Sequence, residues 1–462
     1  MSVGPTGPAA TAPQDPYAPV RDRGYLKLLL VAAVVGFPVC AVAFGFLALV
    51  HALEPLLYTD LPRALGFAGT PIWWPVPLLV LAGLLVGLTI RHLPGQGGHE
   101  PADGLALSGA PPLSALPGVV LAALASLSFG AVLGPEAPLI ALGGGLALGA
   151  VRLLNRGMPE RAAAAVGAAG SFAAVSALLG SPLLGAFLLM EVSGLGGPML
   201  GIVLVPGLLA AGIGALVFTG LGDWTGLGTY SLALHDVPKA AGPTIPEFGW
   251  ALVIGLLAAF AATGVRRLAK FLQGRVVRHR VPMTMLMGLV VGALAVAFAA
   301  ATGKSATEML YSGESALGTL FRDSTGYTVA ALLLLILCKG LAYCVSLSAF
   351  RGGPIFPALF LGAAGGVALS HLPGLSLTAA FAMGVGAMGV AMLKLPMTSV
   401  LLATLLLGGS GLTVMPLVIV AVVVAYVVAL RLTPAAAAPP AKPASGPPDP
   451  ASGPPDPASG AA

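Results

Sequence analysis

GPEAP, the stretch from Gly134 to Pro138, and GPIFP, the stretch from Gly353 to Pro357, share one skeleton at distant places in the chain. In each, the glycine permits a tight turn, and the proline suits the first turn of a helix, where its missing N–H is not needed. Each stretch therefore predicts a helix start. If both starts meet inside the protein, their free N–H groups and positive dipole ends form a site for an anion. Such partial charges hold an anion less tightly than a buried Lys or Arg, so the site favours release as well as binding.

The two stretches belong to a longer internal repeat. Each has a further glycine nine positions after its first one, at Gly143 and Gly362, and each is followed by a second proline before an apolar run, at Pro182 and Pro396. A paired match of this kind is typical of transporters built from two homologous halves, and an inverted arrangement of the halves is the commoner design. The predicted halves are 23–221 and 249–432.

Glu136 stands near the beginning of the first predicted helix, in a stretch without a basic residue between Asp103 and Arg152. A carboxylate in apolar surroundings is costly unless the helix ends that would hold a free anion hold it instead. We therefore predict that Glu136 is a tethered gate, displaced by protonation or by a mobile anion, so that anion entry depends on pH. The alternative is an acidic residue that complements the helix dipole.

A third glycine-rich break, GQGGHEP, runs from Gly95 to Pro101 after an apolar stretch. A break of this kind can bring backbone groups or the side-chain amide of Gln96 to the same anion, and that amide can donate two hydrogen bonds. On these residues alone, a plain loop explains the stretch equally well.

Two further charged residues interrupt apolar runs. Glu191 ends one run, where it can serve a proton path or hydrogen-bond neighbouring backbone, and the structural role is the simpler one. Lys339 lies within LLLILCKGLAY, a costly position for a cation. We expect its side chain to snorkel or to pair with an acidic residue of the preceding segment: Glu308, Glu314 or Asp323.

The composition places these elements in a membrane. Of the 462 residues, 57% are hydrophobic and 8% are charged, whereas a soluble domain carries about 25% charged residues. The 64 glycines and 41 prolines suit short, tilted and broken helices. The sequence lacks the motifs of ATP-driven pumps and hydrolases, and its three cysteines have no metal-ligand spacing. We predict an all-α polytopic membrane protein that is not an enzyme and needs no cofactor, metal or nucleic acid.

Basic residues gather in three regions, at 21–27, 152–161 and 266–280. The positive-inside rule places all three, and with them the N-terminus, in the cytoplasm. The densest region can also bind lipid headgroups, although a topology anchor is the simpler explanation. The remaining predicted segments are a polar lead-in at 1–22, an external loop at 222–248 and a disordered Pro/Ala/Ser/Gly tail at 433–462. The composition suggests a bacterial source, so we expect the plasma membrane.

Over roughly 25–432 the sequence resembles the CLC family of chloride channels and proton/chloride antiporters. GPEAP resembles the family's G-[RK]-E-G-P motif, which puts Glu136 at the gating glutamate; GGPIFP resembles G-x-F-x-P, and GQGGHEP resembles GSGIP followed by an acidic residue. The resemblance implies an inverted repeat of tilted and broken helices, usually a homodimer with one ion path per subunit. It also implies that an anion is held by Gly95, Gln96, Gly97, Gly134, Pro135, Ala137, Gly353, Pro354, Ile355 and Phe356.

The chain departs from the family pattern at several of these positions. Pro135 replaces the motif arginine, and Gln96 replaces the selectivity serine. Pro354 has no N–H, which leaves Ile355 and Phe356 as the expected backbone donors. The family's central tyrosine comes from a final helix that this sequence does not indicate, because Tyr426 falls too early to be its counterpart.

The mode of transport depends on one position in the alignment. Glu191 matches the first acid of a family segment, and Val192 falls where many antiporters carry their internal proton glutamate. We therefore expect passive or weakly proton-coupled flow of chloride or a similar small monovalent anion. The alternative is a proton/chloride or proton/fluoride antiporter, and the alternative of another class is a non-transporting membrane scaffold or sensor. The expected partners are the anion, the lipid bilayer and a second copy of the chain.

Overall fold

The computed structural model describes residues 18–105, 109–155, 157–194, 198–226, 232–234 and 237–433. Nearly all of the predicted tail lies outside the described residues, as do residues 1–17 of the predicted lead-in and part of the predicted external loop. The described part of the chain is helical, apart from short connections.

Eight helices in the described part of the chain are long and apolar enough to cross a membrane. They are α2 (Arg23–Pro55), α4 (Pro75–His92), α6 (Glu136–Leu154), α9 (Pro198–Thr225), α10 (Ile245–Arg278), α11 (Arg280–Thr302), α13 (Val329–Ala349) and α17 (Gly409–Leu432). Further apolar helices are α5 (Leu116–Leu127), α7 (Glu160–Leu178), α8 (Pro182–Ser193), α14 (Ile355–Leu369), α15 (Leu377–Leu393) and α16 (Pro396–Leu406). The predicted all-α polytopic class is confirmed.

Short elements connect these helices. The short α-helices are α1 (Ala18–Arg21), α3 (Leu61–Ala64) and α12 (Ala316–Arg322). One π turn spans Leu56–Asp60, and 3-10 turns span Pro94–Gly97, Pro101–Asp103, Leu113–Ala115, Ala306–Glu308 and Ser324–Gly326.

The apolar sequence around Pro182 forms two helices, α7 and α8. Gly180 takes a φ of 63°, and the chain restarts at Pro182, so α7 and α8 are separate. The Ser181 hydroxyl accepts a hydrogen bond from the N–H of Leu184 at 3.3 Å and caps the new helix. In the second half, α15 and α16 are separated at the corresponding place, where Lys394 has a φ of 62°. Broken helices therefore occur at matching positions in the two halves.

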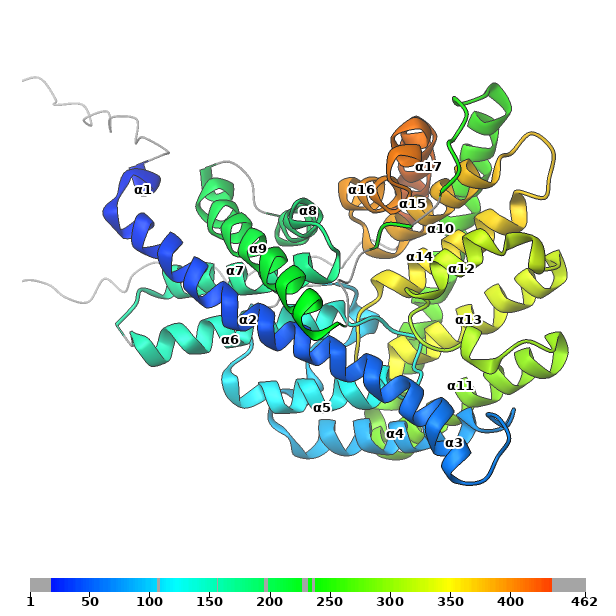
Figure 1. Ribbon diagram of the computed structural model, residues 1–462, viewed down its shortest axis with the longest axis horizontal. Coiled ribbons are helices and arrows are strands. Elements are labelled where there is room, and N and C mark those ends of the chain that lie inside the picture. The colour runs from blue at the N-terminus through cyan, green and yellow to red at the C-terminus, as the bar shows by residue number, and fades with distance from the viewer. Residues whose placement is uncertain are drawn as a thin grey trace, which may run out of the picture.

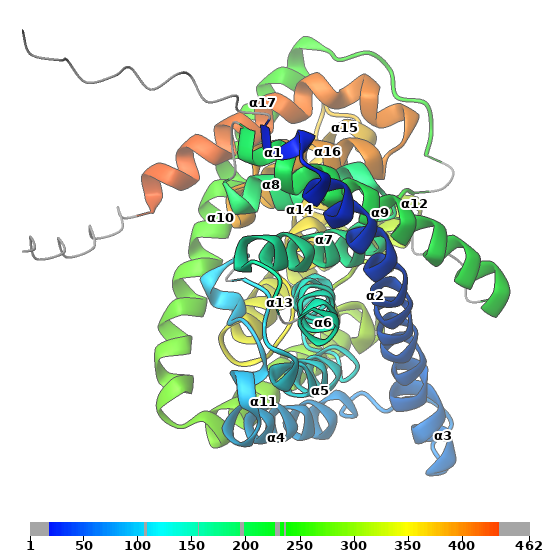
Figure 2. The same cartoon turned by 90° about the vertical axis from the view of Figure 1, so that its left-hand side faces the viewer.

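Figure 1 shows most helices of the first half on one side of the molecule and most helices of the second half on the other. Helices α4 and α11 lie side by side across this division (Figure 2). Their close approach depends on glycine: a Cβ on Gly288 would lie 2.7 Å from the carbonyl carbon of Leu79. Small residues let membrane helices approach in this way and gain van der Waals contact.

Candidate anion site

The two predicted helix starts meet. The N–H of Gly134 donates to the carbonyl oxygen of Gly353 at 2.8 Å, and the N–H of Gly353 donates back to the oxygen of Gly134 at 2.6 Å. Immediately beyond this antiparallel bridge, α6 begins at Glu136 and α14 begins at Ile355. The sequence repeat therefore folds into one continuous site formed by both halves.

Glu136 occupies the centre of this site. Its side chain is fully buried, and one carboxylate oxygen accepts a hydrogen bond from the backbone N–H of Ile355 at the start of α14. The other oxygen, Oε2, makes no hydrogen bond with any described residue. The carboxylate therefore lies where the sequence predicts a free anion, at a helix N-terminus of the opposite half.

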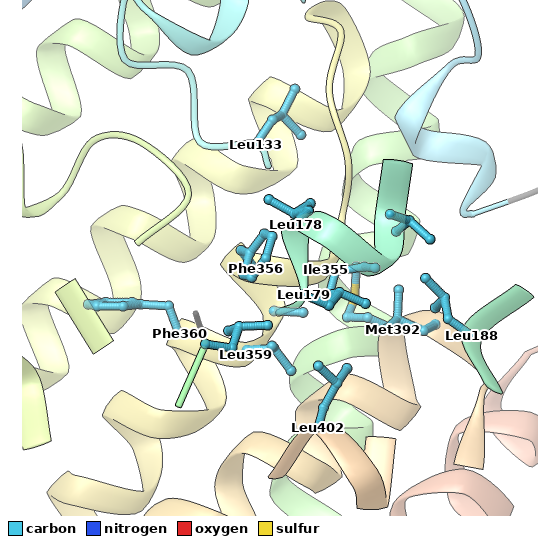
Figure 3. Packing of buried hydrophobic residues seen from close by; sticks show 14 of the residues in the cluster. Leu133, Leu178, Leu179, Leu188, Ile355, Phe356, Leu359, Phe360, Met392 and Leu402 are labelled. Carbon is cyan, nitrogen blue, oxygen red and sulfur yellow. The ribbon is translucent and has the colours of Figure 1, made fainter. Parts of the chain in front are cut away.

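Glycine makes the room for this carboxylate. A Cβ on Gly353 would collide with the Glu136 carboxyl group, and one on Gly134 would collide with it too. On the apolar side, Ile355 and Phe356 lie among leucines of the α7 end and of the segment before α6 (Figure 3). The Glu136 carboxyl group therefore lies in a tight and largely apolar enclosure.

Gly134 and Gly353 are among the residues expected to hold the anion, and the N–H groups of both are engaged in the reciprocal bridge. This bridge fixes the two helix starts relative to each other. Pro354 contributes no N–H, and its carbonyl oxygen accepts a hydrogen bond of 2.6 Å from the buried hydroxyl of Tyr343 on α13. Sequence analysis missed Tyr343, although it ends the LCKGLAY stretch that precedes the second motif.

The residues before and after Glu136 line two different cavities. Pro135 lines a cavity of about 340 Å³ whose charged and titratable wall residues are His51, Glu54, Tyr311, Glu314 and Arg322. Ala137 lines a larger cavity of about 690 Å³. The two chain neighbours of Glu136 therefore line different cavities, and the buried Glu136 lies between them in the sequence.

The glycine-rich loop lies on the larger cavity, which Gly95 and Gly98 also line. All four residues from Gly95 to Gly98 have positive φ, including Gln96 at 50°, a conformation that a side chain disfavours. The Gln96 side chain is exposed, and its amide makes no hydrogen bond with a described residue. The loop thus reaches the cavity beside Ala137 through Gly95 and Gly98, and the contact of the Gln96 amide with an anion stays a prediction.

Sequence analysis also missed Arg351, which precedes the second motif and is 2% exposed. Its Nε donates to the carbonyl oxygen of Gln96 at 3.3 Å, and its Nη2 lies 3.2 Å from Oε1 of Glu100. Arg280 contacts the same oxygen at 2.9 Å, and the Gln273 amide donates to the other one. The only sequence signal was a lone cation between apolar residues and glycines.

The pKa of the Glu100 carboxyl reflects this arrangement. Burial alone would raise the pKa, but Arg351, Arg280 and Gln273 outweigh burial and hold it below the ordinary value for a glutamate. Glu100 is therefore ionised and joins the glycine-rich loop to the second motif and to the α10–α11 corner.

Glu191 forms hydrogen bonds at a different helix start from Glu136. Its carboxylate accepts hydrogen bonds of 2.8 Å from the N–H groups of Met397 and Thr398, and one of 2.6 Å from the Thr398 hydroxyl. It thus satisfies the free N–H groups at the start of α16 in the opposite half.

Lys339 neither snorkels nor pairs with the carboxylate of a described residue, so that expectation was wrong, although its ammonium donates to the backbone carbonyl oxygen of Glu308, one of the expected partner residues, at 3.4 Å. The side chain is fully buried, and its ammonium donates to the carbonyl oxygens of Met309 at 3.1 Å and Leu310 at 2.8 Å. It also lies 4.5 Å from the ring centroid of Phe360. Backbone dipoles and an aromatic face replace the acidic partner because the loop before α12 turns its carbonyls inward.

Comparison with known proteins identifies the family. The sequence profile described as "Voltage gated chloride channel" matches residues 78–430. A protein named "Putative ion-transport protein YfeO" from Salmonella schwarzengrund is 30% identical over 370 residues, which cover 76% of this chain and 82% of that protein. The protein of the same name from Escherichia fergusonii is 28% identical over 366 residues, covering 76% and 81%.

Two solved structures have the same fold. A slow cyanobacterial Cl⁻/H⁺ antiporter superposes with a TM-score of 0.71 at 17% identity, over 88% of this chain and 95% of that one. A CLC-type fluoride/proton antiporter superposes with a TM-score of 0.67 at 20% identity, over 88% and 96%. With the matching profile and the paired helix starts, these similarities establish that the chain belongs to the CLC family of anion-transporting membrane proteins.

Proposed function

We propose that this protein carries chloride or a similar small monovalent anion across the membrane, with Glu136 as the gate. The observation that carries the proposal is the buried Glu136 carboxylate, which accepts a hydrogen bond from the N–H of Ile355 and whose chain neighbours, Pro135 and Ala137, line two different cavities. A mobile anion competes for the same N–H group, and protonation removes the charge that holds the carboxylate there. Both events displace the side chain and join the cavities.

The orientation follows from the predicted topology. The larger cavity is lined by Arg152 and by the loop at Gly95, next to the basic regions that the positive-inside rule places in the cytoplasm. The smaller cavity includes Leu232 and Leu234 of the predicted external loop. We propose that anions pass between an outer vestibule and an inner one, in a homodimer of the plasma membrane with a cytoplasmic N-terminus.

We propose passive or weakly proton-coupled flow as the mode. A proton path from the inner side needs an acceptor, and Val192 offers none. Glu191 is engaged with the start of α16, which supports a structural role for it. Proton-coupled antiport is the second candidate, because both solved structures named above are antiporters.

Chloride efflux from liposomes that hold the purified protein, with internal pH recorded at the same time, tests the proposal. We expect chloride to leave faster than from protein-free liposomes, without stoichiometric proton uptake. Protons that move uphill against a chloride gradient would establish antiport and overturn the passive mode. Absence of chloride flux at every pH between about 4 and 9 would leave the scaffold or sensor alternative.

A further inference from the structure

An apolar groove of about 560 Å³ lies between α10, α13 and α14, away from the candidate anion site. Its lining contains Ile, Leu, Val, Ala, Gly, Met and Cys but no charged side chain. Leu257 of α10 and Leu333 and Leu337 of α13 are 52%, 57% and 58% exposed, so the rim is open along two membrane-spanning helices. The groove therefore faces the hydrocarbon region of the bilayer.

The groove contains three glycines with open space beside them. Gly264 on α10, Gly340 on α13 and Gly365 on α14 all line it, and a Cβ added at any of the three would meet no atom within 4 Å. Elsewhere in the bundle, glycines such as Gly288 are filled by a neighbouring backbone. The three glycines thus leave a slot that the chain itself does not fill, and an unfilled slot forfeits van der Waals contact.

Beyond the groove, the same face of α10 carries a basic residue. The residues of α10 that line the groove repeat at alternating steps of four and three positions. Continuing this repeat places Phe271 and Arg275 next on the same face of the helix. The Arg275 guanidinium lies 3.7 Å from the Phe271 ring centroid, and its Nη1 donates to the Phe271 carbonyl oxygen at 3.4 Å. Among the described residues, no carboxylate forms an ion pair with Arg275.

The groove is long enough for an acyl chain of one leaflet. The α10 wall runs from Ile254 to Leu268, about 21 Å along the helix, which exceeds the thickness of about 15 Å of half of a bilayer's hydrocarbon core. An acyl chain in the slot places its headgroup near Phe271 and Arg275, in the basic region at 266–280 that the positive-inside rule assigns to the cytoplasmic leaflet. That leaflet carries anionic lipids, which basic residues attract.

We propose that this groove binds a phospholipid with an anionic headgroup: one acyl chain fills the slot over Gly264, Gly340 and Gly365, and Arg275 contacts the phosphate. The inner wall of the slot is α14, whose first residue holds the Glu136 carboxylate. A bound acyl chain therefore supports the helix that carries one side of the anion site.

The test is retention of added lipid by detergent-purified full-length protein, measured by native mass spectrometry. The probes are phosphatidylglycerol and phosphatidylcholine with identical acyl chains. The double variant Gly264→Leu/Gly340→Leu places side chains in the slot at two positions where a Cβ meets no atom within 4 Å, and we expect it to lower retention of both lipids at least about tenfold, a loss of about 1.4 kcal/mol. Gly274→Leu is the matched control, since Gly274 is an equally open glycine of α10 outside the groove.

Arg275→Gln distinguishes the contribution of the headgroup to lipid binding from that of the acyl chain. We expect it to abolish the preference for phosphatidylglycerol over phosphatidylcholine while the acyl chain still binds. Equal retention by the wild type and the double variant would overturn the proposal. So would a switch from dimer to monomer in the double variant, which would make the groove a contact between copies. If the double variant does not fold, the two single variants replace it, each with an expected loss of about threefold. None of these readouts depends on anion flux, so they stand or fall separately from the proposed transport.

Discussion

The start of α6 and the start of α14 have the same backbone frame but carry different groups. Each follows Gly-Pro, and the two glycines, Gly134 and Gly353, exchange a pair of hydrogen bonds. In the first half the frame presents the carboxylate of Glu136, whereas in the second half it presents the N–H of Ile355. The repeat positions the two starts, and the difference between them produces the candidate gate.

The largest effect is expected from Arg351, the cation that immediately precedes the second motif and has no counterpart before the first. Arg351→Gln removes one partner of Glu100 and the bond to Gln96. Breaking a buried ion pair costs about 3–5 kcal/mol, and we expect about 3 because Glu100 is 23% exposed. Denaturant titration monitored by Trp fluorescence measures the loss.

The control for this prediction is Lys270→Gln, which breaks the half-exposed pair with Asp103 and should cost less than about 1 kcal/mol. Equal losses in the two variants would show that Arg351 does not tie the glycine-rich loop to the second motif.

Gly353→Ala tests whether the two starts leave room only for the carboxylate. The new methyl group collides with the Glu136 carboxyl, and overpacking of this kind costs about 1–3 kcal/mol. We expect a lower melting temperature and chloride efflux that no longer depends on pH, because the side chain is displaced. Gly249→Ala, on α10 with open space around the Cβ and outside the groove, should change neither. Unchanged pH dependence in Gly353→Ala would contradict the packing argument.

A smaller loss of stability is expected from the caps of α8 and α16, the helices that begin at Pro182 and Pro396. Ser181 caps α8 from within its own half, whereas α16 is capped by Glu191 of the other half. Glu191→Ala should therefore destabilise the protein by about 0.5–2 kcal/mol and loosen the contact between halves. Ser181→Ala gives the matched comparison.

In the passive mode, Glu191→Gln leaves the ratio of proton to chloride flux unchanged, and a fall in that ratio would assign Glu191 to a proton path.

A pH slope, rather than a single loss of stability, is expected from the cavity beside Pro135. Burial raises the pKa of Glu314, in the loop before α12, to about 8, and the charges of Glu136 and Glu54 act in the same direction. The folded protein thus keeps a proton that the unfolded chain releases, so the free energy of unfolding falls as pH rises from the ordinary glutamate value towards 8. Thermal unfolding between pH 5 and about 9 should show this slope in the wild type and a flatter one in Glu314→Gln. Parallel slopes would refute the assignment.

Local signals made the helix starts and the all-α class predictable. Gly-Pro pairs, apolar runs and sparse charge act within a few residues, so Glu136 and Ile355 could be placed at helix starts from sequence. Contacts between distant residues could not be predicted. The reciprocal Gly134–Gly353 bonds span 219 positions, and the Arg351–Glu100 pair spans 251.

Lys339 illustrates the same limit. Its cost in an apolar run was evident from the sequence, but its partners are backbone carbonyls. Every residue carries a carbonyl, so no residue type marks those partners in advance.

The pH dependence of chloride efflux, measured for the wild type and Glu136→Gln in liposomes, tests the central claim most directly. Glutamine keeps the size of the side chain but has no charge to bind the N–H of Ile355 or to lose on protonation. The account predicts that wild-type efflux rises as pH falls and that Glu136→Gln conducts at a rate independent of pH. A variant that keeps the wild-type pH profile would contradict it, because the gate would then lie elsewhere.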